Sequence, residues 1–134
     1  MFQNSLIPEL TVSDFERSLY FYVNILGFHI EYQRETEGFA FLSLEGSQLM
    51  IDQVDKTRTW KTAELLPPFG RGINFQIEVS DIQPILDSLL KNNIQLFMDT
   101  EEKTYLTDGE KVTVKQFLVQ DFDGYLLRFA QKVI

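Results

Sequence analysis

The chain has 134 residues and a mass of 15.7 kDa, enough for a single compact domain with its own hydrophobic core. It has no cysteine and one histidine, His29, which excludes disulfides, thiolate metal sites and any metal site that needs two imidazoles from one subunit. The net charge of −8, with no basic cluster, argues against a nucleic-acid partner, and no apolar run reaches the roughly 18 residues of a membrane span.

The N-terminal residues lack the positive charge that opens a secretory signal peptide. We therefore expect a cytoplasmic protein that has neither nucleic acid nor a membrane as a partner.

The first half begins with an alternating strand that leads into Val12-Ser13-Asp14. A helical pattern of apolar residues follows from 15 to 26, and Gly27 suits the left-handed conformation that ends a helix. Strands of period two are predicted at 28–33, 39–44 and 48–54, with Glu45-Gly46 as a hairpin turn.

Residues 55–72 form the least regular segment and include Trp60 and Phe69. Long irregular segments within a small domain are often functional, so this one fits a lid over a ligand or an arm that crosses between subunits. The alternative is a linker between two repeats, with Trp60 covering a sheet edge.

The second half repeats the order of the first. An alternating strand leads into Val79-Ser80-Asp81, a helical pattern covers 82–90, and Asn92-Asn93 suits the helix end. Strands are predicted at 94–98, 112–119 and 125–130, with turns at Asp108-Gly109 and at 121–124.

The two Val-Ser-Asp triplets lie 67 residues apart, which is half the chain length. Ser13 with Glu16, and Ser80 with Gln83, have the spacing of a capping box, although Pro84 leaves Asp81 as an alternative cap. We predict one α+β domain over 1–134, built from two βαβββ repeats at 1–55 and 72–134 that are joined by a linker at 56–71. The repeats would form a curved mixed sheet around a cleft.

Strand alternation predicts which side chains line this cleft. The candidates of chemical interest are Glu9, Phe39, Phe41, Asp52, Asn74, Gln76, Glu78 and Arg128. Such a lining is acidic and aromatic, so a small cationic aromatic molecule is the expected ligand.

Each candidate has a second interpretation. Phe39 and Phe41 also suit ordinary packing or a dimer contact, and Asp52 also suits an ion pair with Arg128. A strand phase that is wrong by one residue turns Glu9 to solvent, and likewise Glu78. His29 alternates with apolar neighbours at a strand start and is expected at the surface.

The sequence resembles the vicinal oxygen chelate superfamily of glyoxalases, extradiol dioxygenases and bleomycin-resistance proteins. The resemblance covers the whole chain and rests on both Val-Ser-Asp triplets, Leu26-Gly27-Phe28 and the closing segment 121–128. It implies a divalent metal at four positions, which correspond here to Ile7, Asp52, Asn74 and Arg128. Ile7 and Arg128 offer no lone pair to a metal, so the usual metal site is expected to be missing.

The bleomycin-resistance branch is the most similar, through Ile7-Pro8-Glu9-Leu10 and the spacing to Leu26-Gly27-Phe28. This resemblance implies a metal-free homodimer without a cofactor, which binds a cationic drug in clefts and sequesters it unchanged. The cleft aromatics of the branch fall on Tyr32 and Phe39, and Trp60 is a further candidate from the irregular segment. A tryptophan that some members place before the last hairpin is replaced by Thr113 or a neighbour.

Two other functions remain open. A metal-dependent glyoxalase or dioxygenase requires a different register, with Glu9, Asp52 and Glu78 forming an all-oxygen site for Mg²⁺ or Mn²⁺. A metabolite-sensing module of the same fold is the third possibility.

Overall fold

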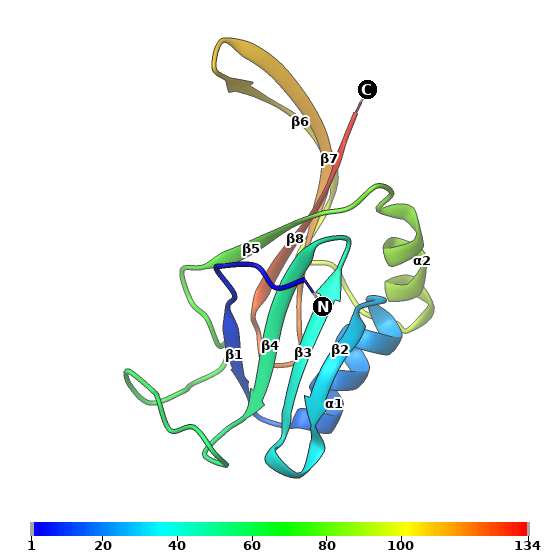
Figure 1. Ribbon diagram of the computed structural model, residues 1–134. Helices are drawn as coiled ribbons and strands as arrows, with labels where there is room; N and C mark the ends of the chain where they lie inside the picture. Colours follow the sequence, from blue (N-terminus) through cyan, green and yellow to red (C-terminus); the bar gives the residue numbers. More distant parts are fainter. Residues whose placement is uncertain (1, 134) are drawn as a thin grey trace. The chain divides into compact units, whose positions relative to one another are not determined.

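The computed structural model describes residues 2–133, in two compact units that divide between Phe69 and Gly70. Each unit contains a helix and a four-stranded sheet in the order βαβββ, as Figure 1 shows. The expected fold class is therefore confirmed: an α+β protein with two repeated halves, each with its own mixed sheet. No helix within 2–133 is long and apolar enough to cross a membrane.

The first unit contains four strands, one α-helix and two short turns of other helix types. The sheet order is β1-β4-β3-β2, with β1 parallel to β4 and the other pairs antiparallel. The elements are β1 (Glu9–Val12), α1 (Phe15–Tyr20), a π-helical turn (Phe21–Ile25), β2 (His29–Arg34), a 3₁₀ turn (Glu35–Glu37), β3 (Phe39–Leu44) and β4 (Ser47–Gln53).

Asp14, rather than Ser13, caps the start of α1. Its Oδ1 accepts the backbone N–H of Arg17 at 3.2 Å. The neighbouring N–H of Phe15 donates to Gln53 Oε1 at 2.7 Å, so a side chain at the end of β4 satisfies a second free donor of the helix. The expected N-cap is therefore wrong, because the residue that precedes the first helical turn is Asp14 and not Ser13.

The core of the first unit follows the alternation of its strands. Apolar residues of β1, β3 and β4 that share one face are buried on the side of α1. Within the helical segment, the Tyr22 ring meets Phe21 and Phe28 edge to face, with centroids 5.4 and 5.5 Å away. Gly27, with a φ of +93°, ends this segment as expected.

The second unit has the sheet order β5-β8-β7-β6, again with its first pair parallel and the others antiparallel. Its elements are β5 (Asn74–Glu78), α2 (Gln83–Lys91), β6 (Met98–Thr107), β7 (Glu110–Gln120) and β8 (Leu126–Lys132). The buried rings of Phe117 and Phe129 stack across β7 and β8, with centroids 5.4 Å apart.

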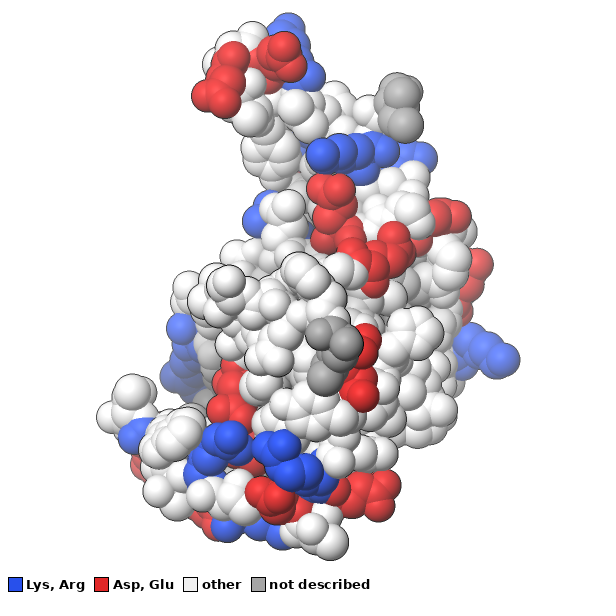
Figure 2. Space-filling view, in the orientation of Figure 1, with Lys and Arg blue, Asp and Glu red and all other residues white. Residues whose placement is uncertain are grey.

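The strand predicted at 94–98 is wrong, because β6 starts at Met98 and continues to Thr107. Its residues beyond Met98 are exposed on both faces, so they carry none of the apolar alternation from which strands are predicted. The strand forms the β6–β7 hairpin, which turns at Asp108-Gly109 with positive φ at both residues, as expected. Figure 2 shows acidic and basic side chains together at the tip of this hairpin.

The N-cap residue of α2 is Ile82, which makes no side-chain capping hydrogen bond, so neither Ser80 nor Asp81 is the N-cap that the sequence predicted. Asp81 Oδ1 accepts the backbone N–H of Gln83 at 2.9 Å. The N–H of Ile82 donates to Gln131 Oε1 at 2.9 Å. Gln131 in β8 thus repeats for α2 what Gln53 in β4 does for α1. The two halves share this strand-to-helix contact, which the sequence did not predict.

Candidate functional site

The helix-free face of the first sheet brings most of the first-half candidates together. The register pairs Phe39 with Asp52 and Phe41 with Met50 across β3 and β4. It also pairs Glu9 with Met50 across β1 and β4. Because directly paired residues point to the same side of a sheet, these side chains share one face, as strand alternation predicted.

Tyr32 joins this face through an irregularity in β2. The pairing of β2 with β3 shifts between Ile30 and Tyr32, which places Tyr32 opposite Phe41. Its ring centroid lies 5.4 Å from that of Phe41 and 5.9 Å from that of Phe39. The side chains of Phe39 and Phe41 are buried, with 1% and 0% of their surfaces exposed, whereas Tyr32 is partly exposed.

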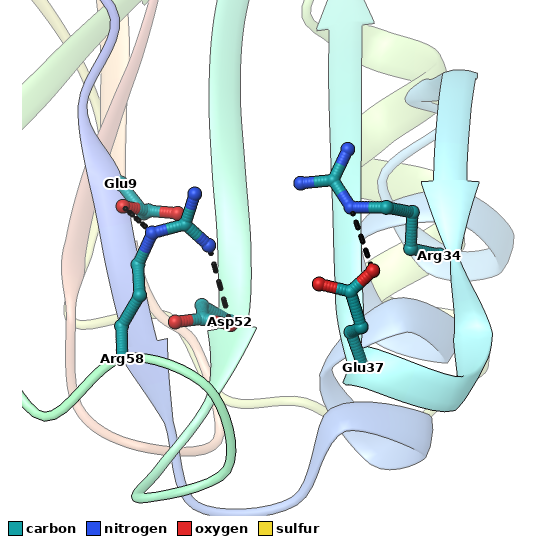
Figure 3. Close-up of polar contacts among 5 residues, drawn as sticks. All are labelled: Glu9, Arg34, Glu37, Asp52 and Arg58. Atoms are coloured by element: carbon teal, nitrogen blue, oxygen red, sulfur yellow. Dashed lines mark ion pairs between the residues drawn. The ribbon is translucent and has the colours of Figure 1, made fainter.

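Two arginines lie over these aromatic rings. The guanidinium of Arg34 is 4.1 Å from the centroid of the Phe39 ring, and its Nε is 3.2 Å from Glu37 Oε2. Arg58 extends from the segment after β4, and Figure 3 shows its guanidinium between Glu9 and Asp52. Its Nε is 3.4 Å from Glu9 Oε1 and its Nη1 is 4.0 Å from Asp52 Oδ1.

We name Glu9, Arg34, Glu37, Asp52 and Arg58 the ion-pair cluster. Its three acids and two bases sum to a formal charge of −1 when all are ionised. Basic and acidic side chains are interleaved over this end of the unit in Figure 2.

Burial raises the pKa of Glu9 and of Asp52, and Arg58 lowers both by a smaller amount. One oxygen of each carboxylate, Glu9 Oε2 and Asp52 Oδ1, is buried and accepts no hydrogen bond. Asp52 is only 2% exposed. The cluster therefore holds two carboxylates that are short of hydrogen-bond donors.

The sequence did not predict either arginine of this cluster. Arg34 lies two residues after Tyr32, so strand alternation carried a signal for it, but the predicted strand ended at residue 33. Arg58 lies in the irregular segment, whose conformation no periodicity indicates. The ion pair of Asp52 is made with Arg58 of the same unit.

Trp60 lies beside the cluster and is 78% exposed. The guanidinium of Arg58 is 5.4 Å from the Trp60 ring centroid and also 5.4 Å from that of Phe39. Arg58 therefore links the exposed indole to the buried rings of the sheet face.

The second-half candidates lie in the second unit. Gln76, Glu78 and Arg128 line a hollow of about 420 Å³, whereas Asn74 is exposed at the start of β5. Glu78 forms an exposed ion pair with Lys132, with 3.8 Å between Oε1 and Nζ.

The strand registers correct one assignment made from the sequence. Glu9 pairs with Met50 and Gln76 pairs with Arg128. Since Glu9 and Gln76 are equivalent in the two repeats, the counterpart of Arg128 is Met50 and not Asp52. The matching roles of Gln53 and Gln131, each three residues further on, give the same correspondence.

The corrected positions do not fit the metal that the resemblance implies. Carboxylates and imidazoles are the usual protein ligands of divalent metals. Neither is present at the four corrected positions, which are Ile7, Met50, Asn74 and Arg128. Across the described residues 2–133, no three His, Cys, Asp or Glu side chains gather as a metal site.

Many solved structures are similar to this chain, and three of them illustrate the range of the similarity. A glyoxalase/bleomycin resistance protein/dioxygenase superfamily member from Vibrio splendidus is 35% identical over 95% of this chain and 97% of its own, with a TM-score of 0.43. A virulence protein from Salmonella typhimurium is 20% identical, covers 99% of both chains and has a TM-score of 0.71. TioX from Micromonospora is 19% identical, covers 98% of this chain and 100% of its own, with a TM-score of 0.73.

None of the curated proteins matches this chain significantly. The model of one family matches residues 6–129, which is nearly the whole sequence. The chain therefore belongs to the Glyoxalase/Bleomycin resistance protein/Dioxygenase superfamily.

Proposed function

We propose that this protein binds a small aromatic molecule with a cationic amino group and sequesters it without chemical change, as bleomycin-resistance proteins do. The observation that carries the proposal is the pair of buried carboxylate oxygens, Glu9 Oε2 and Asp52 Oδ1, that accept no hydrogen bond beside a group of aromatic rings. An ammonium group of the ligand would donate to these oxygens and restore the interactions that burial has removed.

The charge of the site supports a cation. With three acids and two bases, the ion-pair cluster has a formal charge of −1, which one further positive charge would neutralise. A bound ammonium also favours the ionised form of Glu9 and of Asp52, whose pKa values burial raises. An anionic ligand would instead be repelled by the carboxylates of the cluster.

The aromatic part of the ligand has two rings to contact. Arg34 already covers the face of Phe39, so that ring is not open to a ligand. Tyr32 keeps part of its surface exposed, and Trp60 is exposed beside Arg58. We therefore assign the stacking role to Tyr32 and Trp60, with Phe39 and Phe41 as the packed floor beneath them.

The family supports binding as the function, since its description includes bleomycin-resistance proteins. The donor set at the superfamily's metal positions supports sequestration over metal-dependent catalysis. In keeping with the resemblance to bleomycin-resistance proteins, we infer that the protein acts as a cytoplasmic homodimer.

Calorimetric titration tests this function. The ligands are a bleomycin-type glycopeptide, 2-phenylethylamine, and 2-phenylethanol as the neutral match of the amine. We expect at least one cationic aromatic ligand to bind more tightly than about 100 μM, and the amine to bind more tightly than the alcohol. Equal affinity for the amine and the alcohol, or chemical alteration of the recovered ligand in a mass spectrum, would contradict the proposal.

A further inference from the structure

A hollow of about 360 Å³ lies between α2 and the chain that follows this helix. After α2, Asn93 adopts a positive φ of 58°, and the N–H of Ile94 donates to the carbonyl oxygen of Leu89 at 2.9 Å. The chain therefore turns back, and its next residues line the hollow together with the helix. The lining comes from residues 83–99, all within the second unit, and we name this hollow the α2 groove.

Much of the α2 groove is apolar. Leu86 and Leu90 are one turn apart on the same face of α2, and Ile94 and Leu96 line the groove with them. Leu90 is 78% exposed and the other three are partly exposed. The alternation of segment 94–98 predicted a strand, but nearly all of this segment precedes β6. Ile94 and Leu96 therefore supply apolar surface to the groove and not to a sheet, as at an interaction site.

The surroundings of the α2 groove are acidic. Asp87 and Asp99 line it, and no lysine or arginine among residues 2–133 forms an ion pair with either of them. An adjoining hollow of about 320 Å³ shares Gln83 and Leu86 with the groove. Its lining adds three acidic side chains and one basic side chain, which are Asp81, Glu101, Glu102 and Lys115. In the part of the chain that the structure describes, five carboxylates thus surround the groove and its extension, against one ammonium.

We propose that the α2 groove binds an amphipathic helix of a partner protein, with apolar side chains beside Leu86 and Leu90 and with lysines or arginines at the acidic rim. Helices that bind in grooves are anchored by apolar side chains at helical spacing, and the unpaired carboxylates select positive charge. A second copy of this chain would bring a net charge of −8 to an acidic face, so the charge favours a basic partner. The inference does not depend on the function proposed for the ion-pair cluster.

The experiment is a fluorescence-anisotropy titration of the full chain with the labelled peptide acetyl-LKKLLKKLLKKL-amide. We expect a dissociation constant on the order of 100 μM, as for a small exposed groove. Two labelled controls separate the two contributions: acetyl-SKKSSKKSSKKS-amide keeps the charge without the apolar side chains, and acetyl-LEELLEELLEEL-amide reverses the charge. Each control should bind at least about tenfold more weakly. Absence of binding, or equal binding of the leucine–lysine and serine–lysine peptides, overturns the proposal.

Matched variants locate the site. Leu90→Ser should weaken binding of the leucine–lysine peptide by about fivefold, whereas Leu106→Ser, at a leucine that is 75% exposed, should leave it unchanged. Asp87→Asn/Asp99→Asn should also weaken it by about fivefold. Asp108→Asn/Glu110→Gln removes the same charge from exposed positions at the β6–β7 turn and should have no effect. Equal losses in a variant and its control overturn the proposal.

Sedimentation velocity tests the other occupant of the groove. Self-association of the unchanged chain that Leu90→Ser abolishes would assign the α2 groove to a second copy and overturn the proposal. Self-association that is the same with and without Leu90→Ser supports a groove that stays open for a partner. Binding of 2-phenylethylamine serves as the reference for the ion-pair cluster, and Leu90→Ser should leave it unchanged, so failure at one site is distinguishable from failure at the other.

Discussion

The side-chain oxygen of Gln53 accepts the backbone N–H of Phe15 across 2.7 Å, so the last strand of the first unit fixes the start of α1. The amide nitrogen of Gln53 also donates to the carbonyl oxygen of Ser13 at 2.9 Å. Both ends of one side chain are thus used where the chain passes from β1 to α1.

Gln53→Ala removes both hydrogen bonds and leaves a free donor at the start of α1. We expect the free energy of unfolding to fall by about 1–2 kcal/mol, the usual effect of losing a helix cap. Urea denaturation measures it, with the exposed Gln95→Ala as the control. A loss no greater than that of the control would show that the contact does not stabilise the helix.

Gly38 precedes β3 with a φ of +66°, and a Cβ built there lies 2.6 Å from Gln53 Cβ. Gly46 also has a positive φ, +91°, but has open space around it. Gly38→Ala and Gly46→Ala therefore share the backbone penalty, and only the first adds a steric clash. We expect Gly38→Ala to be more destabilising by about 1–3 kcal/mol in thermal or urea unfolding. Equal effects would contradict the close approach of Gly38 to Gln53.

Much of this fold could be predicted from the sequence. Apolar and polar residues alternate along β1, β3, β4 and β5, and this alternation indicates which face of each strand is buried. The same alternation placed Glu9, Phe39 and Asp52 on one face. It failed for β6, whose exposed residues have no apolar face, and for Arg58, whose segment has no period. The ion-pair partner of Asp52 is Arg58 of that segment, so the alternation of residues in the strands could not predict the charge of the site.

Asp52→Asn should stabilise the protein at neutral pH. Burial raises the pKa of Asp52 in the folded state, so its contribution to stability is favourable below the unfolded-state pKa and is lost as the pH rises through the folded-state value. Replacing the carboxylate by an amide removes this loss. We expect a higher free energy of unfolding at pH 7 than for the unchanged protein, and a smaller difference in acid.

The exposed variant Glu16→Gln serves as the control for this comparison, since it removes one acidic charge without burial. A decrease in stability of Asp52→Asn at pH 7 would mean that the ion pair with Arg58 outweighs the cost of burying Asp52.

Binding of a cationic aromatic ligand should depend on pH. The ligand prefers the ionised forms of Glu9 and Asp52, and burial raises the pKa of both in the free protein. Affinity should therefore fall as the pH is lowered through these raised values, with protons taken up as the ligand leaves. Calorimetry of 2-phenylethylamine at several pH values measures this dependence. The neutral 2-phenylethanol shows how much of it does not involve the positive charge of the ligand. A pH-independent affinity for the amine would show that the amine does not bind to these two carboxylates.

The central claim is that Glu9 and Asp52 hold the cationic group of the ligand. Its most direct test is the dissociation constant of the tightest cationic aromatic ligand with the double variant Glu9→Gln/Asp52→Asn, measured at neutral pH beside Glu16→Gln. The account predicts that the double variant binds at least about tenfold more weakly, while Glu16→Gln keeps the original affinity. An unchanged dissociation constant in the folded double variant would contradict it.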